Sequence, residues 1–281
     1  MMSQAVLVIH GGAGARASGR RLTQIRQHLR TICDEAYAQL RSYSARDAVV
    51  FAVERLEDDP LFNAGTGSAL QQDGVARMSA SIMDGASRRF AAVLNIERVR
   101  HPVRVAERLL KKSDRVLAGR EATRFARSQG MPAWNPVMPE RWRQWRSRRR
   151  GQYGTVGAVA LDARGRLAAA TSTGGKGFER PGRVSDSGLP VGNYANDRVA
   201  ISCTGIGEDI MEEGLAVQFA QRVADGASLR RAVTRTAHEL TQHHRRLGFI
   251  AVDWQGHYTW CTTLPVLCAV ARTPTRRVDS F

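Results

Sequence analysis

The chain has 281 residues, 43% of them hydrophobic, so it can bury a full-sized core and is neither a disordered nor a fibrous protein. Its formal net charge of +16 favours anionic partners, although charge alone says little about fold or chemistry. The N-terminal apolar run is short and has no basic region ahead of it. We therefore expect no membrane association and a cytoplasmic protein.

The first third of the chain predicts a strand, two helices and a hairpin. Ala5–Ile9 is short and β-branched, which favours a buried strand, and the HGGAGA sequence after it predicts a glycine turn. Apolar residues recur at helical spacing over Leu22–Leu40, and a second helix is expected over Ala45–Leu56. The turn-rich segment Asp58–Gly85 then predicts a loop and a hairpin with its turn near QQDG.

The middle of the chain predicts one strand, two helices and a linker. Ala91–Ile96 is a strand candidate, and Val103–Lys111 and Gly119–Gln129 read as helices. Regular spacing then stops, because Gly130–Tyr153 carries three prolines and an arginine run. We expect an exposed linker at about residues 130–153.

The last part of the chain predicts a run of short strands beside a run of helices. This pattern favours a layered α+β domain over alternating βαβ units. The expected strands are Val156–Asp162, Leu167–Ser172, Val199–Cys203, Phe249–Asp253 and His257–Leu264, and the expected helices are Ile210–Ala224 and Ser228–His244.

Cysteine and histidine patterns do not predict a metal site. Cys33, Cys203, Cys261 and Cys268 form no CxxC pair, so we expect buried free thiols rather than a zinc site or a disulfide framework. The HELTQHH sequence resembles the HExxH metalloprotease motif, but Gln242 stands where the second histidine would be needed. We interpret it as a polar helix end.

Other common motifs are incomplete. HGGAGA lacks the lysine of a phosphate-binding loop, and no GxSxG nucleophile elbow occurs. The arginine run Arg141–Arg150, with Trp142 and Trp145 between its charges, is the basis of an alternative function, an uncleaved protein that binds nucleic acid. No other nucleic-acid signature accompanies the run, so we do not expect a nucleic-acid partner.

Thr155 opens an apolar, β-branched segment directly after Gly154 and the arginine run. A threonine hydroxyl needs a base, and cutting the preceding peptide bond would free the residue's own α-amino group for that purpose. An α-amine titrates near about 7.7 to 8.0 and is partly unprotonated at neutral pH. Glycine tolerates strained backbone at such a bond. Taken alone, however, a Gly-Thr pair before a strand is common, and Thr155 reads better as an ordinary strand residue.

A set of spaced motifs carries a family resemblance. The sequences IHGGAGA, PLFNAGTGSAL, GTVGAVALD, AATSTGG, PGRVSDS, NYAN and SCTGIGE occur in this order. Together they resemble the plant-type L-asparaginase and isoaspartyl peptidase family of N-terminal-nucleophile hydrolases, most strongly over Gly154–Glu208. The resemblance implies a four-layer αββα sandwich.

The resemblance implies roles for the residues around the nucleophile. Thr155 matches the nucleophile, which the precursor releases by cutting itself between Gly154 and Thr155. Thr173 matches the threonine that hydrogen-bonds near the nucleophile and orients it. Asn63 matches an asparagine in a loop close to it.

The resemblance also implies how substrate would be held. Thr204 and Gly205 match an oxyanion hole of one hydroxyl and one backbone N–H. Arg183 matches the residue that binds the substrate α-carboxylate, and Asp186 the residue that holds its α-ammonium group. Gly207 lies where a backbone carbonyl also meets the ammonium. An arginine fork suits a carboxylate, and an aspartate suits an ammonium group.

The implied activity is hydrolysis of β-aspartyl dipeptides and of the side-chain amide of L-asparagine through an acyl-enzyme; a glycosylasparaginase of the same fold is an alternative. The precursor would yield one subunit of residues 1–154 and one of residues 155–281, which together make one domain and pair as an (αβ)₂ assembly. No cofactor would be required. The resemblance further implies a structural sodium ion held by backbone carbonyls of the loop Leu56–Thr66.

Overall fold

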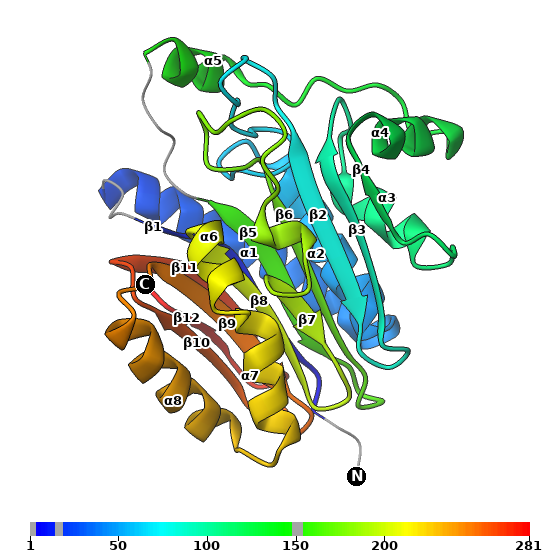
Figure 1. The fold of residues 1–281 in the computed structure, drawn as a ribbon. Helices are drawn as coiled ribbons and strands as arrows, with labels where there is room; N and C mark the ends of the chain where they lie inside the picture. The colour runs from blue at the N-terminus through cyan, green and yellow to red at the C-terminus, as the bar shows by residue number, and fades with distance from the viewer. Residues whose placement is uncertain (1–3, 15–18, 148–153) are drawn as a thin grey trace.

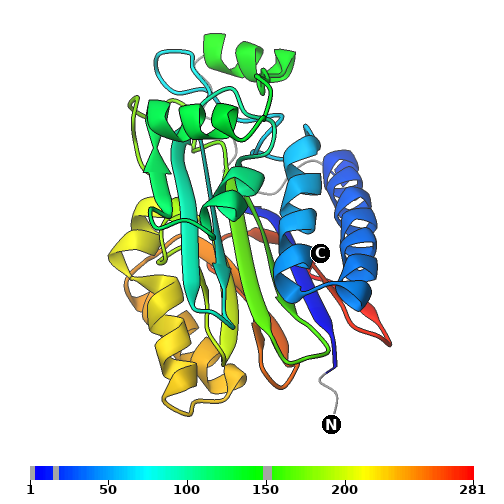
Figure 2. The same cartoon turned by 90° about the vertical axis from the view of Figure 1, so that its right-hand side faces the viewer.

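The computed structural model describes residues 4–14, 19–147 and 154–281. Two β-sheets pack face to face, and helices cover the outer face of each (Figures 1 and 2). The molecule is thus a four-layer αββα sandwich, which confirms the α+β class expected from the sequence.

The larger sheet has eight strands in the order β12-β11-β1-β5-β6-β2-β3-β4. Neighbouring strands are antiparallel except for β3 and β4, which are parallel. Both faces of the central strands β5 and β6 are covered, so every residue of these two strands is buried. The strands are β1 (Val6–Gly14), β2 (Met78–Asp84), β3 (Arg89–Ile96), β4 (Val116–Ala118), β5 (Thr155–Leu161), β6 (Leu167–Thr173), β11 (Val266–Arg272) and β12 (Arg277–Asp279).

The smaller sheet is antiparallel, with the order β10-β9-β8-β7. Its inner face packs on the larger sheet, where Ile250 of β9 joins Val8 of β1 and Val159 of β5 in one apolar cluster. Burial of this interface removes apolar surface from water and holds the two sheets together. The strands are β7 (Asn193–Ala195), β8 (Val199–Gly205), β9 (Leu247–Asp253) and β10 (Tyr258–Thr262).

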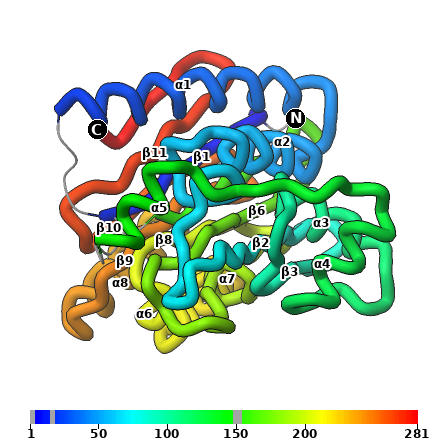
Figure 3. The backbone as a smooth tube through the Cα atoms, turned by 90° about the horizontal axis from the view of Figure 1, so that it is seen from above, coloured from blue at the N-terminus to red at the C-terminus, as the bar shows by residue number. Residues whose placement is uncertain are grey.

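Each outer layer is a set of amphipathic helices. The helices α1 (Gly19–Ser42), α2 (Ala45–Asp58) and α3 (Pro102–Leu109) contribute apolar residues to the core over the larger sheet. The helices α7 (Leu215–Ala224) and α8 (Leu229–Gln242) do the same for the smaller sheet, on the opposite side of the molecule (Figure 3). The remaining helices are α4 (Gly119–Ser128), α5 (Pro139–Arg146) and α6 (Gly207–Glu212).

The glycine turn expected at HGGAGA is wrong, because β1 continues to Gly14. The pairing with β11 shifts register between His10 and Ala13, and Gly12 has a positive φ of 111°. A Cβ on Gly12 would lie 3.0 Å from the Cα of Gly154. The glycines therefore let an irregular strand pass close to another backbone, which sequence alone did not reveal.

The hairpin turn expected near QQDG is also wrong. Gln71–Gly74 does form a turn, with the N–H of Gly74 donating to the carbonyl of Gln71 at 2.9 Å, but no strand precedes it. The hairpin is formed by β2 and β3, which pair across residues 85–88. Residues 61–70 stay in an irregular loop, in which the Asn63 side chain satisfies part of the backbone because its Oδ1 accepts the N–H of Ala69.

Two helical predictions also change. The expected helix Ile210–Ala224 is two helices, α6 and α7, separated at Gly214, whose φ is 55°. Within the expected exposed linker, α5 forms a regular helix and buries Arg141, which packs under the loop that follows α2. The rest of that linker, residues 148–153, lies outside the described residues. The subunit boundary itself stays a prediction.

Of the four cysteines, Cys33, Cys203 and Cys268 are buried and Cys261 is partly exposed, all as free thiols. Across the described ranges, His, Cys, Asp and Glu side chains do not gather in a group of three that could hold a metal ion. None of the described helices has the length and apolar character needed to cross a membrane.

Candidate active site

The predicted site residues meet at the end of the sandwich where β5 begins and β6 and β8 end. Of the nine, all but Asn63 and Thr204 line one small cavity, which has about 10 Å³ of space for the centre of a water molecule. Such a volume holds roughly one water and no substrate. The cavity is lined by Gly154, Thr155, Thr173, Gly175, Lys176, Arg183, Ser185, Asp186, Gly205, Ile206 and Gly207.

Thr155 is the first residue of β5 and lies opposite Thr173 in the pairing with β6. The Thr155 hydroxyl donates to the Thr173 hydroxyl oxygen at 3.3 Å, and that oxygen also accepts the N–H of Gly175 at 3.1 Å. Strand pairing therefore positions the two hydroxyls, and the turn after β6 holds Thr173 in place. Thr155 is only 7% exposed in the uncut chain.

Asn63 acts one step away from the cavity. Its Nδ2 donates to the carbonyl of Gly175 at 2.5 Å, and its Oδ1 accepts the N–H of Ala69 at 2.8 Å. The N–H of Gly174 donates to the Asn63 carbonyl at 2.8 Å. A Cβ on Gly174 would lie 2.5 Å from the Cβ of Ser68, so only glycine fits. The loop after α2 thus holds the turn that follows Thr173 in place through hydrogen bonds to Gly174 and Gly175.

Arg183 is held by Glu208, to which the sequence analysis assigned no role. Arg183 donates through Nε and Nη2 to the two carboxylate oxygens, both at 3.0 Å, and Lys176 donates to Glu208 at 2.9 Å. Desolvation raises the pKa of Glu208, but the hydrogen bonds from Arg183 and Lys176 outweigh it and lower the pKa to about 2. The sequence did offer a signal for Glu208, because this residue ends the SCTGIGE motif.

Asp186 is buried, and within the described structure its Oδ2 has no hydrogen-bond partner. Burial raises the pKa of Asp186 to about 6, although the charge of Arg183 opposes the shift. A buried carboxylate of this kind favours a cationic partner at neutral pH. A Cβ on Gly207 would lie 2.6 Å from Asp186 Oδ1 and from Arg183 Nη2, so this glycine leaves room for both groups.

Thr204 and Gly205 end β8 beside the cavity. Thr204 is fully buried, and its hydroxyl accepts the N–H of Ala13 in β1 at 3.2 Å. Gly205 has a φ of 128°, and a Cβ there would lie 2.5 Å from the Cα of Leu247. Gly205 therefore brings the backbone to the cavity wall, while the Thr204 side chain lies behind it.

A polar group under β5 was missed by the sequence analysis. His10 Nε2 lies 2.9 Å from Ser202 Oγ, which lies 2.7 Å from Thr171 Oγ1. Burial lowers the pKa of His10 to about 3, so the ring is neutral. His10 pairs with Gly157, where a Cβ would lie 2.0 Å from Ser202 Oγ. The signal in the sequence was His10 itself, a polar residue placed directly after the apolar run AVLVI.

The loop Leu56–Thr66 fits a sodium ion poorly, because several of its carbonyls already accept protein donors. The carbonyl of Glu57 accepts the N–H of Thr66 at 2.6 Å, and that of Asn63 accepts the N–H of Gly174. The carbonyl of Phe62 lies 3.5 Å from a guanidinium nitrogen of Arg141. The sodium ion that the family resemblance implies stays a prediction.

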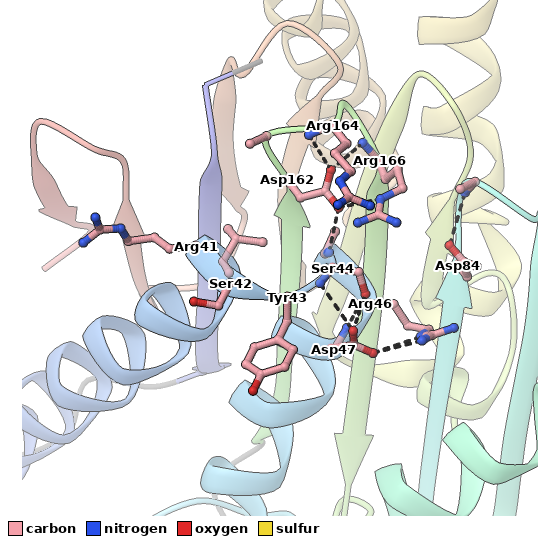
Figure 4. A pocket seen from close by; sticks show the side chains of 14 residues that line it. Arg41, Ser42, Tyr43, Ser44, Arg46, Asp47, Asp84, Asp162, Arg164 and Arg166 are labelled. Atoms are coloured by element: carbon pink, nitrogen blue, oxygen red, sulfur yellow. Dashed lines mark hydrogen bonds and ion pairs between the residues drawn. The ribbon is translucent and has the colours of Figure 1, made fainter. Parts of the chain in front are cut away.

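A larger cavity of about 410 Å³ lies at the other end of β5, between the start of α2 and the turn after the strand (Figure 4). Several of its polar side chains pair with neighbouring groups, whereas Arg41 and Tyr43 point away from them (Figure 4). Asp162 accepts the N–H of Ala45 and pairs with Arg166 at 2.7 Å, while Ser44 and Asp47 form a capping box for α2. These groups satisfy each other and stabilise the helix start.

Among the described residues of the arginine run, Arg141 and Trp145 are not free to contact nucleic acid. Arg141 is buried, and Trp145 donates its Nε1–H to the carbonyl of Gln71 at 2.9 Å and stacks on Phe178 with ring centroids 6.3 Å apart. Trp142 is 39% exposed. Part of the run is therefore packed against the protein itself, and residues 148–150 lie outside the described structure.

Comparison with known proteins shows what the whole chain is similar to. A family model described as asparaginase matches residues 3–153 and 147–279. The chain is 43% identical over 295 residues to an isoaspartyl peptidase/L-asparaginase of Synechocystis sp., covering 98% of this chain and 90% of the relative. It is 44% identical to a protein of the same name from Nostoc sp. over 289 residues, covering 95% and 91%. It is 40% identical to an isoaspartyl peptidase of Salmonella typhimurium over 285 residues, covering 91% of each.

Proposed function

Because the chain belongs to the asparaginase family, we propose that it is a self-processed amidohydrolase that acts on β-aspartyl dipeptides and on the side-chain amide of L-asparagine. The observation that carries the proposal is the cavity in which Thr155, at the start of β5, meets Arg183 and Asp186. A nucleophile thus lies beside a cation for a carboxylate and an anion for an ammonium group. These are the two charges of an amino-acid head group.

Self-cleavage would precede activity. The Thr155 hydroxyl attacks the carbonyl carbon of Gly154, the C–N bond breaks, and water hydrolyses the resulting ester to a Gly154 carboxylate. The new α-amine of Thr155 then has a pKa near about 7.7 to 8.0 and serves as the base for its own hydroxyl. The close passage of Gly12 supports this step, because β1 packs there against the backbone of both Gly154 and Thr155.

In the mature enzyme Thr155 would attack the side-chain carbonyl of the substrate. The N–H of Gly205, in the cavity wall, would stabilise the oxyanion that forms. The family resemblance implies the Thr204 hydroxyl as the second donor, which requires that this side chain reach the cavity from behind Gly205. Each such donor is typically worth about 2.7 to 4 kcal/mol. Collapse expels ammonia or the second amino acid, and the aspartyl ester on Thr155 is hydrolysed by water. Thr173 supports the reaction by its hydrogen bond to the nucleophile.

Substrate orientation follows from Arg183, Asp186 and Gly207. Glu208 uses only two of the five N–H donors of the Arg183 guanidinium, so others are free for the substrate α-carboxylate. Asp186 and the Gly207 carbonyl accept from the α-ammonium group. The side-chain carbonyl of the substrate then points at Thr155. The enzyme would therefore hydrolyse the amide bond at the side chain and not the bond at the α-carboxyl group.

We infer that the two fragments stay together as one domain. Strand β1 belongs to the first fragment and β5 to the second, and the two strands pair in the same sheet. Pairing of two such units as (αβ)₂ rests on the family resemblance. A cytoplasmic location is supported by the cysteines, which form no disulfide in the described structure.

The first test is the intact mass of the purified protein under denaturing conditions, with N-terminal sequencing of any fragment. We expect a fragment that begins Thr-Val-Gly-Ala. The cleaved protein is then assayed for ammonia release from L-asparagine and for aspartate release from a β-aspartyl dipeptide, with the isomeric α-aspartyl dipeptide as the control. An uncut chain that hydrolyses neither substrate would refute the proposal. An uncut chain with strongly salt-dependent affinity for nucleic acid would favour the alternative function.

A further inference from the structure

Arg141 is a buried cation in the first turn of α5, and its side chain points into the loop that follows α2. The residue is 7% exposed. Its Nε donates to the carbonyl of Gly67 at 2.5 Å, its Nη2 lies 3.5 Å from the carbonyl of Phe62, and its Nη1 donates to Gln144 Oε1 at 3.0 Å. Two backbone carbonyls and one amide oxygen therefore surround the guanidinium.

The oxygens around Arg141 are neutral. The neighbouring carboxylate of Glu140 pairs with Arg143 instead, at 2.9 Å. Burial lowers the pKa of Arg141 to about 10, so the guanidinium is still charged at neutral pH. Carbonyl dipoles thus compensate a buried positive charge, which is also how proteins hold alkali cations.

The Phe62 carbonyl lies within the loop Leu56–Thr66, directly before Asn63, and the Gly67 carbonyl follows at the end of that loop. The segment before α5 adds further ties to the same loop, because the Gly67 N–H donates to the Pro136 carbonyl at 2.8 Å and Trp134 Nε1 donates to the Thr66 hydroxyl at 3.2 Å. Asn63 in turn clamps the turn that follows Thr173. Arg141 is therefore linked to the cavity through the backbone of this loop and the hydrogen bond from Asn63 to Gly175.

We propose that the Arg141 guanidinium is the fixed cation of this loop and takes the place of the sodium ion that the family resemblance implies. Arg141 is then a positioning residue, because it acts on the site through Asn63 and touches neither the nucleophile nor the substrate. The protein would hold the loop without a bound alkali cation. The inference goes beyond the proposed function and does not depend on it.

The test is thermal unfolding in sodium chloride, potassium chloride and choline chloride at equal concentration. The melting temperature of the wild-type protein is expected to be the same in all three salts. Arg141→Met should melt about 5 °C or more below wild type in choline chloride, because the carbonyls lose their donor. Sodium or potassium should restore part of that loss by occupying the freed carbonyls.

Arg143→Met is the matched control. Arg143 lies on the same helix with a side chain 75% exposed, so its replacement removes the same charge from the surface. Its melting temperature should stay within about 1 °C of wild type, with the same response in each salt. Arg141→Lys keeps the charge but loses the planar fork, and it should melt between wild type and Arg141→Met. This variant carries the test if Arg141→Met does not fold.

Several outcomes would overturn the proposal. Sodium-specific stabilisation of the wild-type protein would show that the loop still binds an alkali cation. If Arg141→Met had the same melting temperature as Arg143→Met, the proposed positioning role of Arg141 would be contradicted. Destabilisation that neither sodium nor potassium relieves would show that the side chain fills space rather than serving as a cation. None of these readouts requires catalytic activity, so failure of the proposed function would leave the test intact.

Discussion

The two ends of β5 both place buried polar side chains beside a cavity, yet they differ in how fully those groups are satisfied. At the far end, Asp162 accepts hydrogen bonds from the backbone N–H groups of Ala45, Arg164 and Arg166. It also forms an ion pair with the Arg166 side chain. At the near end, Asp186 keeps one buried oxygen without a partner among the described residues.

This difference separates a structural cluster from a site that is built for a ligand. Groups that satisfy each other stabilise the fold and have no donor or acceptor to spare, whereas an unpaired buried carboxylate costs stability until a ligand arrives. Cavity size gives the opposite impression, since the far end has about 410 Å³ and the near end about 10 Å³. Hydrogen-bond completeness is therefore the better guide here.

The largest expected effect is at the near end of the strand. Thr155→Ala should abolish self-cleavage and lower kcat by at least about 10⁴-fold, because the nucleophile and its amine are lost together. The measurements are intact mass and ammonia release from L-asparagine. Thr155→Ser keeps a hydroxyl and should retain both reactions. Substantial turnover by Thr155→Ala would refute the nucleophile assignment.

Arg183→Met should raise KM for L-asparagine by about 100-fold, because the substrate carboxylate loses a charged, forked donor. Steady-state kinetics on cleaved protein measure the change. Arg180→Met is the matched control: it is exposed, lies three residues earlier and should leave KM unchanged. An unchanged KM for Arg183→Met would mean that Arg183 only anchors Glu208.

Asp186 predicts opposite effects on activity and stability. Since its pKa is raised to about 6, kcat/KM should fall as the pH drops through about 6, where the carboxylate that holds the ammonium is neutralised. The folded state binds this proton more tightly than the unfolded chain does, so ionisation of Asp186 costs stability as the pH rises from about 4 to above 6.

Asp186→Asn removes that cost while it removes the acceptor for the ammonium group. The variant should be inactive, yet at pH 8 it should melt a few degrees above wild type, with the difference shrinking toward pH 4. Paired activity and melting curves across pH measure both effects. If the melting temperature of Asp186→Asn differed from that of wild type by the same amount at pH 4 and at pH 8, the unpaired state of Asp186 would be contradicted.

The smallest effect on activity is expected at the far end. Asp162→Asn should lower the free energy of unfolding by about 2 kcal/mol, because a buried acceptor of several hydrogen bonds loses its charge. Its kcat and KM should match those of wild type. Chemical denaturation and steady-state kinetics check the two statements, and a clear loss of kcat would show that the two ends of β5 are coupled.

Local pattern in the sequence was sufficient for most helices and central strands. The helical spacing over Leu22–Leu40 and the apolar run at Leu167–Ser172 predicted α1 and β6 because periodicity reports directly on which faces are buried. It failed at His10–Gly14, where glycines mark a close approach between backbones rather than a turn. It also missed β7, β11 and β12, and the packing of α5.

The sequence by itself determined the order of the motifs and offered Thr155 as a candidate nucleophile. Through the family resemblance that these motifs carry, it also offered Arg183 and Asp186 as candidate partners, whose charges suit a carboxylate and an ammonium group. Only the tertiary structure decided that Glu208 holds Arg183, that Asp186 Oδ2 is left unpaired and that Arg141 is buried against loop carbonyls. Such contacts join residues far apart in the chain. Hydrogen bonding and burial depend on the folded arrangement, which no local pattern records.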